Sequence, residues 1–584
     1  MINKNRNFQV RDDQTLFDMM RLYNNTSAQF QPFYDEQTEL FDFTVGALQW
    51  DKQVRATLRK ENRPANSYNF IRTILNVVFS VERDNRKKGK ASPRTGGDND
   101  LANVVTQTLD YYLYHSGFAE AQKRVFMDAI VARLGVYHVG WEYNGSEDQI
   151  GNLFTRAVDP REMMFEPNYN DPLWKESAFV MRKHSMNVEE MLNTFALNDG
   201  EMQQSIMKEA ALFFEKDRKR SKWVTQKLKS LFNAVYETAT GVDSYDDHTN
   251  YLKWWDPYTG KFDVLELHEK RMEKRLVVPE GNKLVDLTDV YSKEYESLEG
   301  KAFNGMTYDN EIINRLRKNY QLKGQATEDL VNRRFQTIVI PTFMLKVSEQ
   351  PYPFDSPYYV YLPQYCYDTH ADPMKLQSIM DDLVDPQADF NKSKSLILEL
   401  LGRYANKGWI MDENAISGLE DDWSTNKIAP YRRVRAGYIN MVRPEEGQTI
   451  SPELVKMPLE MQQLMKVITN ADDEIRGNRS AGVNSGKHFL AKEERQAKSF
   501  TFVLENRDMA QRALYEQSLA FIQHYATTQQ VIRVVSDIGN AKGQPVTINK
   551  SEFAIEQDRI VERVINDIDA YKYDIEITDE PYSA

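Results

Sequence analysis

The stretch from Glu474 to Phe489, EIRGNRSAGVNSGKHF, contains the residue types of a phosphate-binding loop, with three glycines and then a lysine. Such a loop needs a glycine, four residues, and then Gly-Lys followed by a hydroxyl residue, because backbone amides surround the phosphates and the hydroxyl reaches magnesium. Gly477 and Gly482 have this spacing, but a valine and an asparagine follow them. Lys487 follows the third glycine, but His488 stands in place of the hydroxyl residue. The pattern is therefore more typical of a mobile loop than of a nucleotide site.

The segments on either side of this stretch are predicted to be helices. The preceding PLEMQQLMKVITNADDEIRG has apolar residues at helical spacing, with Pro458 as the expected start and Gly477 as the expected end. The following TFVLENRDMAQRALYEQSLAFIQHY predicts a second long helix. A nucleotide-binding loop follows a buried strand, so this context also argues against one.

No other group of residues predicts catalysis or metal binding. The best candidate for a metal site is Asp368, His370 and Asp372 in DTHAD, but Asp372 precedes Pro373 and is expected to cap a helix. The chain has no Gly-x-Ser-x-Gly motif, and its single cysteine, Cys366, excludes a disulfide framework and a cysteine-rich zinc site. We therefore expect no catalytic residues, no metal and no cofactor, and predict that the chain is not an enzyme.

The charge of the chain argues against tight binding to nucleic acid. The 584 residues include 74 basic and 87 acidic ones, which gives a net charge of −13. Strong non-specific DNA binding relies on clustered cations at phosphates. No apolar run reaches the length of a membrane span, the N-terminus does not read as a signal peptide, and one cysteine fits a reducing cytoplasm.

Hydrophobic patterns predict a mixed α and β chain. An amphipathic helical region is expected from Asp100 to Leu134, followed by a half-buried strand in VYHVGWEYNG with LFTRAVDP as its antiparallel partner. The core of this part is expected under Trp141 and Phe165. The basic run RDNRKKGKASPRTGG is predicted to be a solvated loop. A helix is expected to start at the Asp372-Pro373 pair and to bend at Pro386.

Two stretches resemble the portal (head–tail connector) proteins of tailed bacteriophages, especially the short-tailed type. They are FMDAIVARLGVYHVGWEYN and GNLFTRAVDPREMMFEPNYNDPLWKESAFVMRKHSMNVEEMLNTF. In that family a helix ends at a glycine, a strand follows, and a strand and turn with a V/I-D-P pattern precede a helix opened by M-x-x-E-E. The matching residues are Gly135, Val158, Asp159, Pro160, Glu162, Phe165, Glu166, Pro167, Met186 and Glu189, with Glu166 at a position that is often Asp. The resemblance covers roughly Ser67 to Tyr582.

The resemblance implies a structural role in the virion. Portal proteins form rings of about twelve copies at one capsid vertex, around a channel for double-stranded DNA. They are assembled in the host cytoplasm, nucleate the capsid, dock the terminase, and bind tail adaptor proteins and the major capsid or scaffolding protein. The passing DNA is held without sequence preference, which suits a chain of net charge −13. The alternatives are another structural virion protein without a channel, such as an adaptor or scaffold, and, less favoured, a nucleotide-binding enzyme.

The resemblance also implies an α+β portal fold. It comprises a mixed wing domain, two long stem helices, a small β-containing clip, a long helix with a tunnel loop, and the start of a C-terminal crown. The expected division is 1–306 wing, 307–334 stem helix 1, 335–373 clip, 374–406 stem helix 2, 407–457 second part of the wing, 458–526 long helix with the tunnel loop at about 477–492, and 527–584 crown or its beginning. Whether the crown ends at Ala584 or continues is left open.

Two sets of site residues follow from this division. The tunnel loop is expected to face DNA with Arg479, Lys487, His488, Lys492, Arg495 and Lys498. The alternative for these cations is an ordinary solvated surface, since Glu493 and Glu494 lie among them. The clip is expected to dock terminase and adaptor proteins through Phe343, Tyr352, Phe354, Tyr358, Tyr359 and Tyr361.

Overall fold

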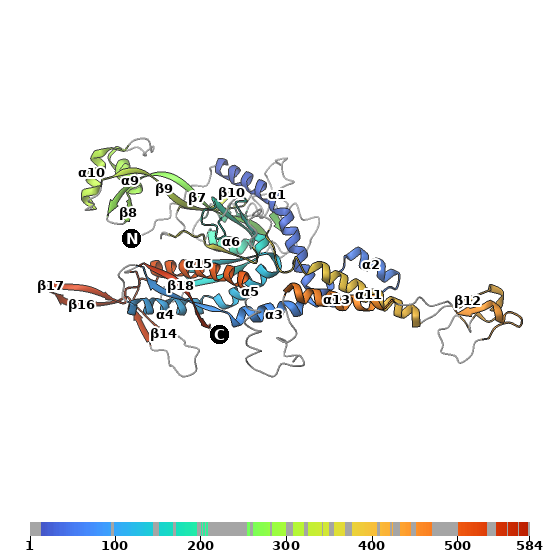
Figure 1. Cartoon of the computed structure of the whole chain (residues 1–584). Helices are drawn as coiled ribbons and strands as arrows, with labels where there is room; N and C mark the ends of the chain where they lie inside the picture. Colours follow the sequence, from blue (N-terminus) through green and yellow to red (C-terminus); the bar gives the residue numbers. More distant parts are fainter. Residues whose placement is uncertain are drawn as a thin grey trace, which may run out of the picture.

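The computed structural model describes the chain in ranges that are separated by gaps. The described residues are 13–94, 99–143, 151–167, 171–195, 200, 203–204, 206–207, 254–256, 261–280, 283–299, 308–320, 325–340, 343–349, 356–367, 376–405, 409–420, 423, 433–444, 451–469, 500–533, 545–556, 559–569 and 572–581. They form a mixed body from which a helical hairpin and a long strand ribbon project in different directions (Figure 1).

Four helices and three strands build the centre of the body. The helices are α1 (Asp13–Thr44), α4 (Asn99–His115), α5 (Phe118–Ala132) and α15 (Thr501–Tyr525). Their buried residues join one hydrophobic cluster with strands β2 (Leu134–Glu142), β3 (Asn152–Val158) and β11 (Tyr361–Tyr365). The predicted helical region from Asp100 is thus two helices, because Gly117 takes a left-handed φ of 82° between them.

The predicted pairing of the central strands is confirmed. Strand β2 lies between β3 and β11 and is antiparallel to both, and it runs opposite β3 from Val136↔Val158 to Glu142↔Asn152. Gly135 allows the start of β2 to approach α5, since a Cβ there would lie 2.1 Å from the carbonyl oxygen of Val125. Gly135, which matches the glycine of the portal pattern, therefore lets β2 pack closely against α5.

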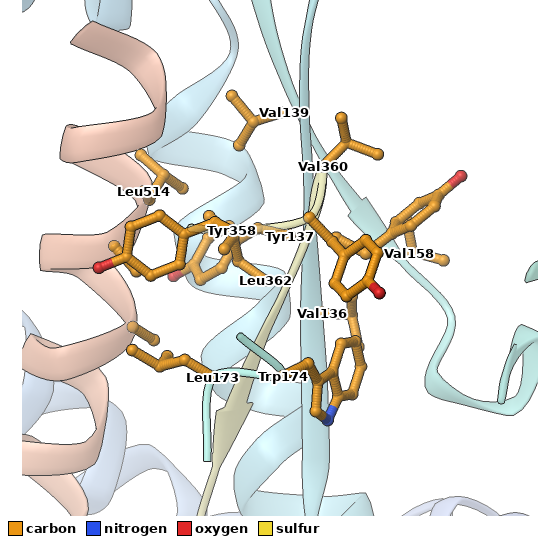
Figure 2. Close-up of a cluster of buried hydrophobic side chains, with 14 of the residues drawn as sticks. Val136, Tyr137, Val139, Val158, Leu173, Trp174, Tyr358, Val360, Leu362 and Leu514 are labelled. Atoms are coloured by element: carbon orange, nitrogen blue, oxygen red, sulfur yellow. The ribbon is translucent and has the colours of Figure 1, made fainter. Parts of the chain in front are cut away.

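The two predicted core aromatics differ in burial. Phe165 is fully buried, and its ring stacks on Trp174 with centroids 4.8 Å apart. Trp141 is only half-buried at the edge of the cluster, where it stacks on Tyr525 at 5.6 Å. Figure 2 shows Trp174 and Leu173 below Val136, Tyr137 and Leu362, and Phe165 and Trp174 are both fully buried members of this cluster.

A larger antiparallel sheet extends out of the body as a ribbon. Its main path is β10-β9-β7-β5-β4, and β6 and β8 also pair with β7. The strands are β4 (Met163–Phe165), β5 (Phe179–Asn187), β6 (Trp255–Asp256), β7 (Lys261–Glu280), β8 (Lys283–Asp286), β9 (Thr327–Ile340) and β10 (Phe343–Glu349). The far end of β7 and β9 packs with α9 (Thr288–Glu299) and α10 (Asn310–Asn319) around a small core of its own. Helix α6 (Val188–Phe195) follows β5 and packs on the near end.

The expected stem helix at 307–334 and the expected clip at 335–373 are wrong as structural units. Among the described residues of 307–334, helix is confined to Asn310–Asn319, and β9 begins at Thr327 because its residues pair with β7. Residues 335–340, β10 and β11 belong to the two sheets of the body instead of forming a separate module. The charged sequence TEDLVNRRF resembles a helix locally, but strand pairing overrides that preference.

The basic run that we expected as a solvated loop contains strand β1 (Lys87–Pro93). It pairs antiparallel with β18 (Tyr573–Pro581), the last strand of the chain. Gly89 packs against the ring of Tyr515 on α15, where a Cβ would come within 2.9 Å. The charge of the basic run is partly neutralised, since Lys87 forms an ion pair with Asp508 at 3.2 Å. The expected crown region therefore returns to the body through β18.

Two antiparallel pairs precede β18 in the C-terminal region. They are β14 (Gln530–Arg533) with β15 (Pro545–Ile548), and β16 (Lys550–Glu556) with β17 (Arg559–Ile565). Figure 1 shows β16 and β17 extending away from the body.

The projecting hairpin consists of α11 (Val384–Ala405) and α13 (Pro452–Thr469), which pack side by side (Figure 1). Two helix starts are corrected here. Pro386 lies in the first turn of α11 instead of bending a longer helix, and Pro458 lies inside α13 instead of opening it.

At the far end of the hairpin lies a small module formed by β12 (Trp409–Met411) and β13 (Val442–Pro444). We call residues 409–444 the tip module. Residues 407–457 were expected to join the wing, but β12 and β13 pair with each other beyond the helices, and α13 already begins at 452.

No helix in the described ranges is both long and apolar enough to span a membrane. Within the same ranges, no three His, Cys, Asp or Glu side chains come together as a possible metal site.

Candidate functional site

The segment 470–499 contains the glycine-rich stretch, and both residues that flank it are fixed in one core. Met465 and Thr469 at the end of α13 are buried, as are Phe500 and Val503 at the start of α15. Met465, Phe500 and Val503 belong to the same hydrophobic cluster, together with α3 (Ile71–Asp84). The described residues on the two sides of this segment therefore pack in one core, while residues 470–499 themselves lie outside the described ranges.

A buried arginine fixes the start of α15 to the body. Arg507 is fully buried and donates hydrogen bonds to the carbonyl oxygens of Glu82 at 3.2 Å and Asn85 at 2.8 Å. It also donates to Asp508 at 2.5 Å. The carbonyl of Glu82 also accepts from the amide of Asn85 at 3.2 Å, so Arg507 adds a second donor at the end of α3 and one just beyond it.

The side chains of α11 hold an extended segment, 62–70, along the start of the hairpin. Gln387 and Asn391 bind the backbone of this segment at Phe70 and Tyr68, with amide-to-oxygen distances of 3.0 and 2.8 Å. One and two turns further on, Ser395 accepts from the amide of Asn66, and Glu399 pairs with Arg63 at 3.0 Å. Four side chains at intervals of four residues share one helix face, so they form a continuous polar ladder. We call Gln387, Asn391, Ser395 and Glu399 the α11 ladder.

The rest of the hairpin exposes apolar side chains. On α13, Leu459 is 57% exposed and Val467 is 76% exposed. The exposed apolar residues of the hairpin are Leu396, Leu398, Leu401, Val455, Met457, Leu459, Leu464, Val467 and Ile468. Exposed apolar residues gathered on one hairpin are typical of a surface that contacts another chain, because water does not stabilise them.

The tip module is also apolar on its surface. Ile439 is 75% exposed, and Trp409, Ile410 and Met441 are exposed as well. The indole of Trp423 donates to the carbonyl oxygen of Arg433 at 2.8 Å, which links these two positions of the module. Exposed aromatic and aliphatic residues at the end of a projection form a suitable surface for partner proteins.

The six cations predicted for the tunnel loop lie outside the described residues. Arg479, Lys487, His488, Lys492, Arg495 and Lys498 all belong to the segment 470–499. Their assignment to a DNA-facing loop stays a prediction.

The predicted docking role of the clip aromatics is wrong for three of them. Tyr358, Tyr359 and Tyr361 are buried in the body, and Figure 2 shows Tyr358 directed toward α15 beside Leu514. Their hydroxyls donate to Glu516 at 2.6 Å, to the carbonyl of Ser177 at 2.7 Å and to Glu266 at 2.9 Å. These tyrosines therefore link elements within the chain. Phe343 lies in β10, and Tyr352 and Phe354 lie outside the described ranges.

Glu266 lies at the centre of a buried polar cluster between the two sheets. It accepts from Tyr361 and from Gln336 at 2.6 Å, and its carboxylate lies 2.7 Å from Nε2 of His268. Burial raises the pKa of Glu266, but the histidine hydrogen bond and charge outweigh that effect and hold the pKa well below its usual value. Burial also lowers the pKa of the adjacent His138 to about 3. The cluster is enclosed by side chains of the body, and its hydrogen bonds link β7 and β9 of the larger sheet to β11 of the smaller one.

Sequence reasoning missed the hairpin surface, although a signal was present. The segments LILELL on α11 and LVKMPLEMQQLMKVI on α13 have apolar residues on more than one helix face. A helix that is apolar all round must be covered on all sides. The helical spacing of the second segment alone predicts an ordinary amphipathic helix.

Comparison with protein-family models places the chain in a known family. The family model of the phage P22-like portal protein matches residues 20–584. No curated protein matches the chain. The match covers almost the whole chain, including the body, the hairpin, the tip module and the segment 470–499. The chain belongs to the family of phage P22-like portal proteins, which are structural proteins of the virion.

Proposed function

We propose that copies of this chain close into a ring of about twelve at one vertex of the capsid, around a channel for double-stranded DNA. The observation that carries this proposal is the exposed apolar surface on α11 and α13. In a closed ring each copy meets two neighbours through two different faces, so a projecting hairpin can be covered on both sides. The ring would stand in the virion after assembly in the host cytoplasm.

The parts of the portal then divide differently from the expectation. We assign the stem to α11 and α13, and the clip to the tip module at residues 409–444. Support comes from their place in the fold, since two packed helices lead away from the body and end in a small β module (Figure 1). The tip module is where terminase and the tail adaptor proteins would dock. The body would meet the major capsid or scaffolding protein and nucleate assembly.

The segment 470–499 is proposed to contain the tunnel loop, at about 477–492, which faces the DNA. Its support is the anchoring of both flanking helices in one core, which lets a long loop reach away from a fixed base. Its cations would make transient, non-specific contacts with phosphates, while the net charge of −13 keeps the channel from gripping the DNA.

The ring is tested by measuring the mass of the purified chain in solution and by negative-stain imaging. We expect a closed ring of about twelve copies with a central hole. Replacing Leu459 and Val467 by Gln should shift the chain toward protomers, because it weakens the apolar contact. Replacing Met272 and Tyr320 by Gln, which are exposed on the ribbon and its end, should leave the ring intact. A wild-type chain that remains a protomer at high concentration would contradict the proposal.

The tunnel loop is tested separately. Changing Lys487, Lys492 and Arg495 to Glu should leave ring formation unchanged and reduce DNA packaging or retention. Rings of this variant that package and hold DNA like the wild type would remove the electrostatic role of the loop.

A further inference from the structure

Helix α2 (Lys52–Lys60) forms a regular helix, but none of its residues is buried against the rest of the chain. Asp51 caps it by accepting from the amides of Gln53 and Val54 at 2.8 and 2.9 Å. A helix of nine residues is marginal in water when nothing packs on it. Its formation without a buried face suggests that another surface covers it in the assembled protein.

The charge of α2 is opposite to that of the chain as a whole. Its sequence KQVRATLRK has four cations and no acid, whereas the chain carries −13. Lys52, Arg59 and Lys60 are exposed, and none of them forms an ion pair with a described residue. Val54 is also exposed, but helical spacing puts it on the face opposite these cations. The helix therefore presents one cationic face and a separate face with an exposed valine.

The position of α2 is fixed by the α11 ladder. The segment 62–70 follows α2 directly, and the ladder binds its backbone at three places and Arg63 at a fourth. Figure 1 shows α2 beside the α11–α13 hairpin at the side of the molecule. A rigid connection of this kind lowers the entropic cost of docking, because the helix is already held in place.

An acidic surface of matching character lies near the base of the hairpin. Asp35, Glu39 and Asp42 are exposed on α1 at a spacing that puts them on one helix face. Arg133 binds both Glu36 of α1 and Asp381, just before α11, so these two elements lie together. Asp382 and Asp385 are also exposed next to Asp381, and the apolar Val45 and Leu48 are exposed beyond the end of α1. We call this set the acidic face.

We propose that α2 of one copy docks on the acidic face of the next copy in the ring. This contact rests on the ring of the proposed function and names one of its interfaces. In a cyclic assembly every copy offers both surfaces, so each α2 finds an acidic face. Copies that each carry −13 repel one another, and a local pairing of opposite charges offsets that repulsion. The exposed carboxylates of the acidic face give these cations a protein partner, and DNA phosphates are the alternative that the test separates.

The test uses charge reversal on each surface and on both together. Variant A carries Lys52→Glu, Arg59→Glu and Lys60→Glu, and variant B carries Asp35→Lys, Glu39→Lys and Asp42→Lys. Variant AB combines them. A control with Lys274→Glu, Lys293→Glu and Lys318→Glu changes the net charge as variant A does, but on exposed positions of β7, α9 and α10. The readout is the protomer concentration at which half of the full-length chain is in rings, measured at low and high salt.

We expect variants A and B each to raise that concentration at least about tenfold at low salt, and less at high salt, where exposed charges are screened. Variant AB should return close to the wild type, because the restored pairs have opposite polarity, and the control should stay close to it. An unchanged variant A would overturn the contact while wild-type rings still stand. A loss in variant A without a loss in B and without rescue in AB would overturn it too, and would point to an anion outside the chain, such as DNA. A wild-type chain without rings would refute both the ring and this contact.

Discussion

Replacing Arg507 by Met tests whether the start of α15 depends on one buried guanidinium. The side chain is fully buried, and its loss leaves the carbonyls of Glu82 and Asn85 without this donor. Breaking a buried ionic network by removing one partner costs about 3–5 kcal/mol. Glu82 keeps its two hydrogen bonds to Arg86, at 2.9 Å each, so we expect the lower end of that range, about 3 kcal/mol.

The assay is chemical denaturation of the unassembled chain, followed by intrinsic fluorescence. Arg512→Met is the matched control, because Arg512 lies on the same helix and is exposed. We expect a clearly lower denaturant midpoint for Arg507→Met and a midpoint within about 0.5 kcal/mol of the wild type for the control. Arg507→Lys should recover part of the loss, since an ammonium can still donate, but not in the geometry of the guanidinium. Equal midpoints for Arg507→Met and Arg512→Met would refute the argument.

Three further predictions concern the body. Gly135→Ala should prevent normal folding, because the added Cβ would lie 2.1 Å from the carbonyl oxygen of Val125, and the protein should be insoluble or sensitive to protease. Gly402 on α11 has open space around it, so Gly402→Ala should stabilise the chain by about 0.5–1 kcal/mol. Burial raises the pKa of Asp128 to about 7, so the unfolded chain ionises this group first and stability falls as pH rises from about 4 to about 7. Asp128→Asn should therefore be more stable than the wild type at pH 8, and this advantage should vanish near pH 4 in denaturation curves. Tyr359→Phe should lower stability by about 1–3 kcal/mol, since it leaves a buried carbonyl without its donor, and an unchanged midpoint would show that water replaces the hydroxyl.

Local patterns predicted those elements whose partners lie close in the sequence. The strand beginning at Val136 and its partner at 152–158 are neighbours along the chain, and their alternation was enough to pair them. The long helix α15 was also predicted, because its apolar residues recur over many turns. The M-x-x-E-E pattern likewise leads into a helix, α6.

The errors share a physical cause, which is pairing over long distances. The stretch 327–334 becomes a strand because β7 binds it, and nothing in its own charges requires that. The three tyrosines at 358–361 were predicted to dock partner proteins because the family resemblance placed the clip at 335–373. Their hydroxyls are instead satisfied by residues up to 182 positions away in sequence. The sequence signal for the hairpin surface was the large number of apolar residues on its two helices. The pattern of one helix taken alone does not show that such residues face another chain.

The pairing of β1 with β18 has a consequence for synthesis on the ribosome. Arg94 and Asp574, which join the ends of these strands, are separated by 480 positions. At roughly 5–20 residues per second, β1 waits about 25–100 seconds before its partner is made. During that time its unpaired amides and carbonyls can bind other nascent chains. Lys87, Lys88 and Lys90 on this strand oppose such pairing, because charged lysines on an open strand edge repel a second copy. The basic run, which first suggested a loop, thus protects the unfinished protein from aggregation.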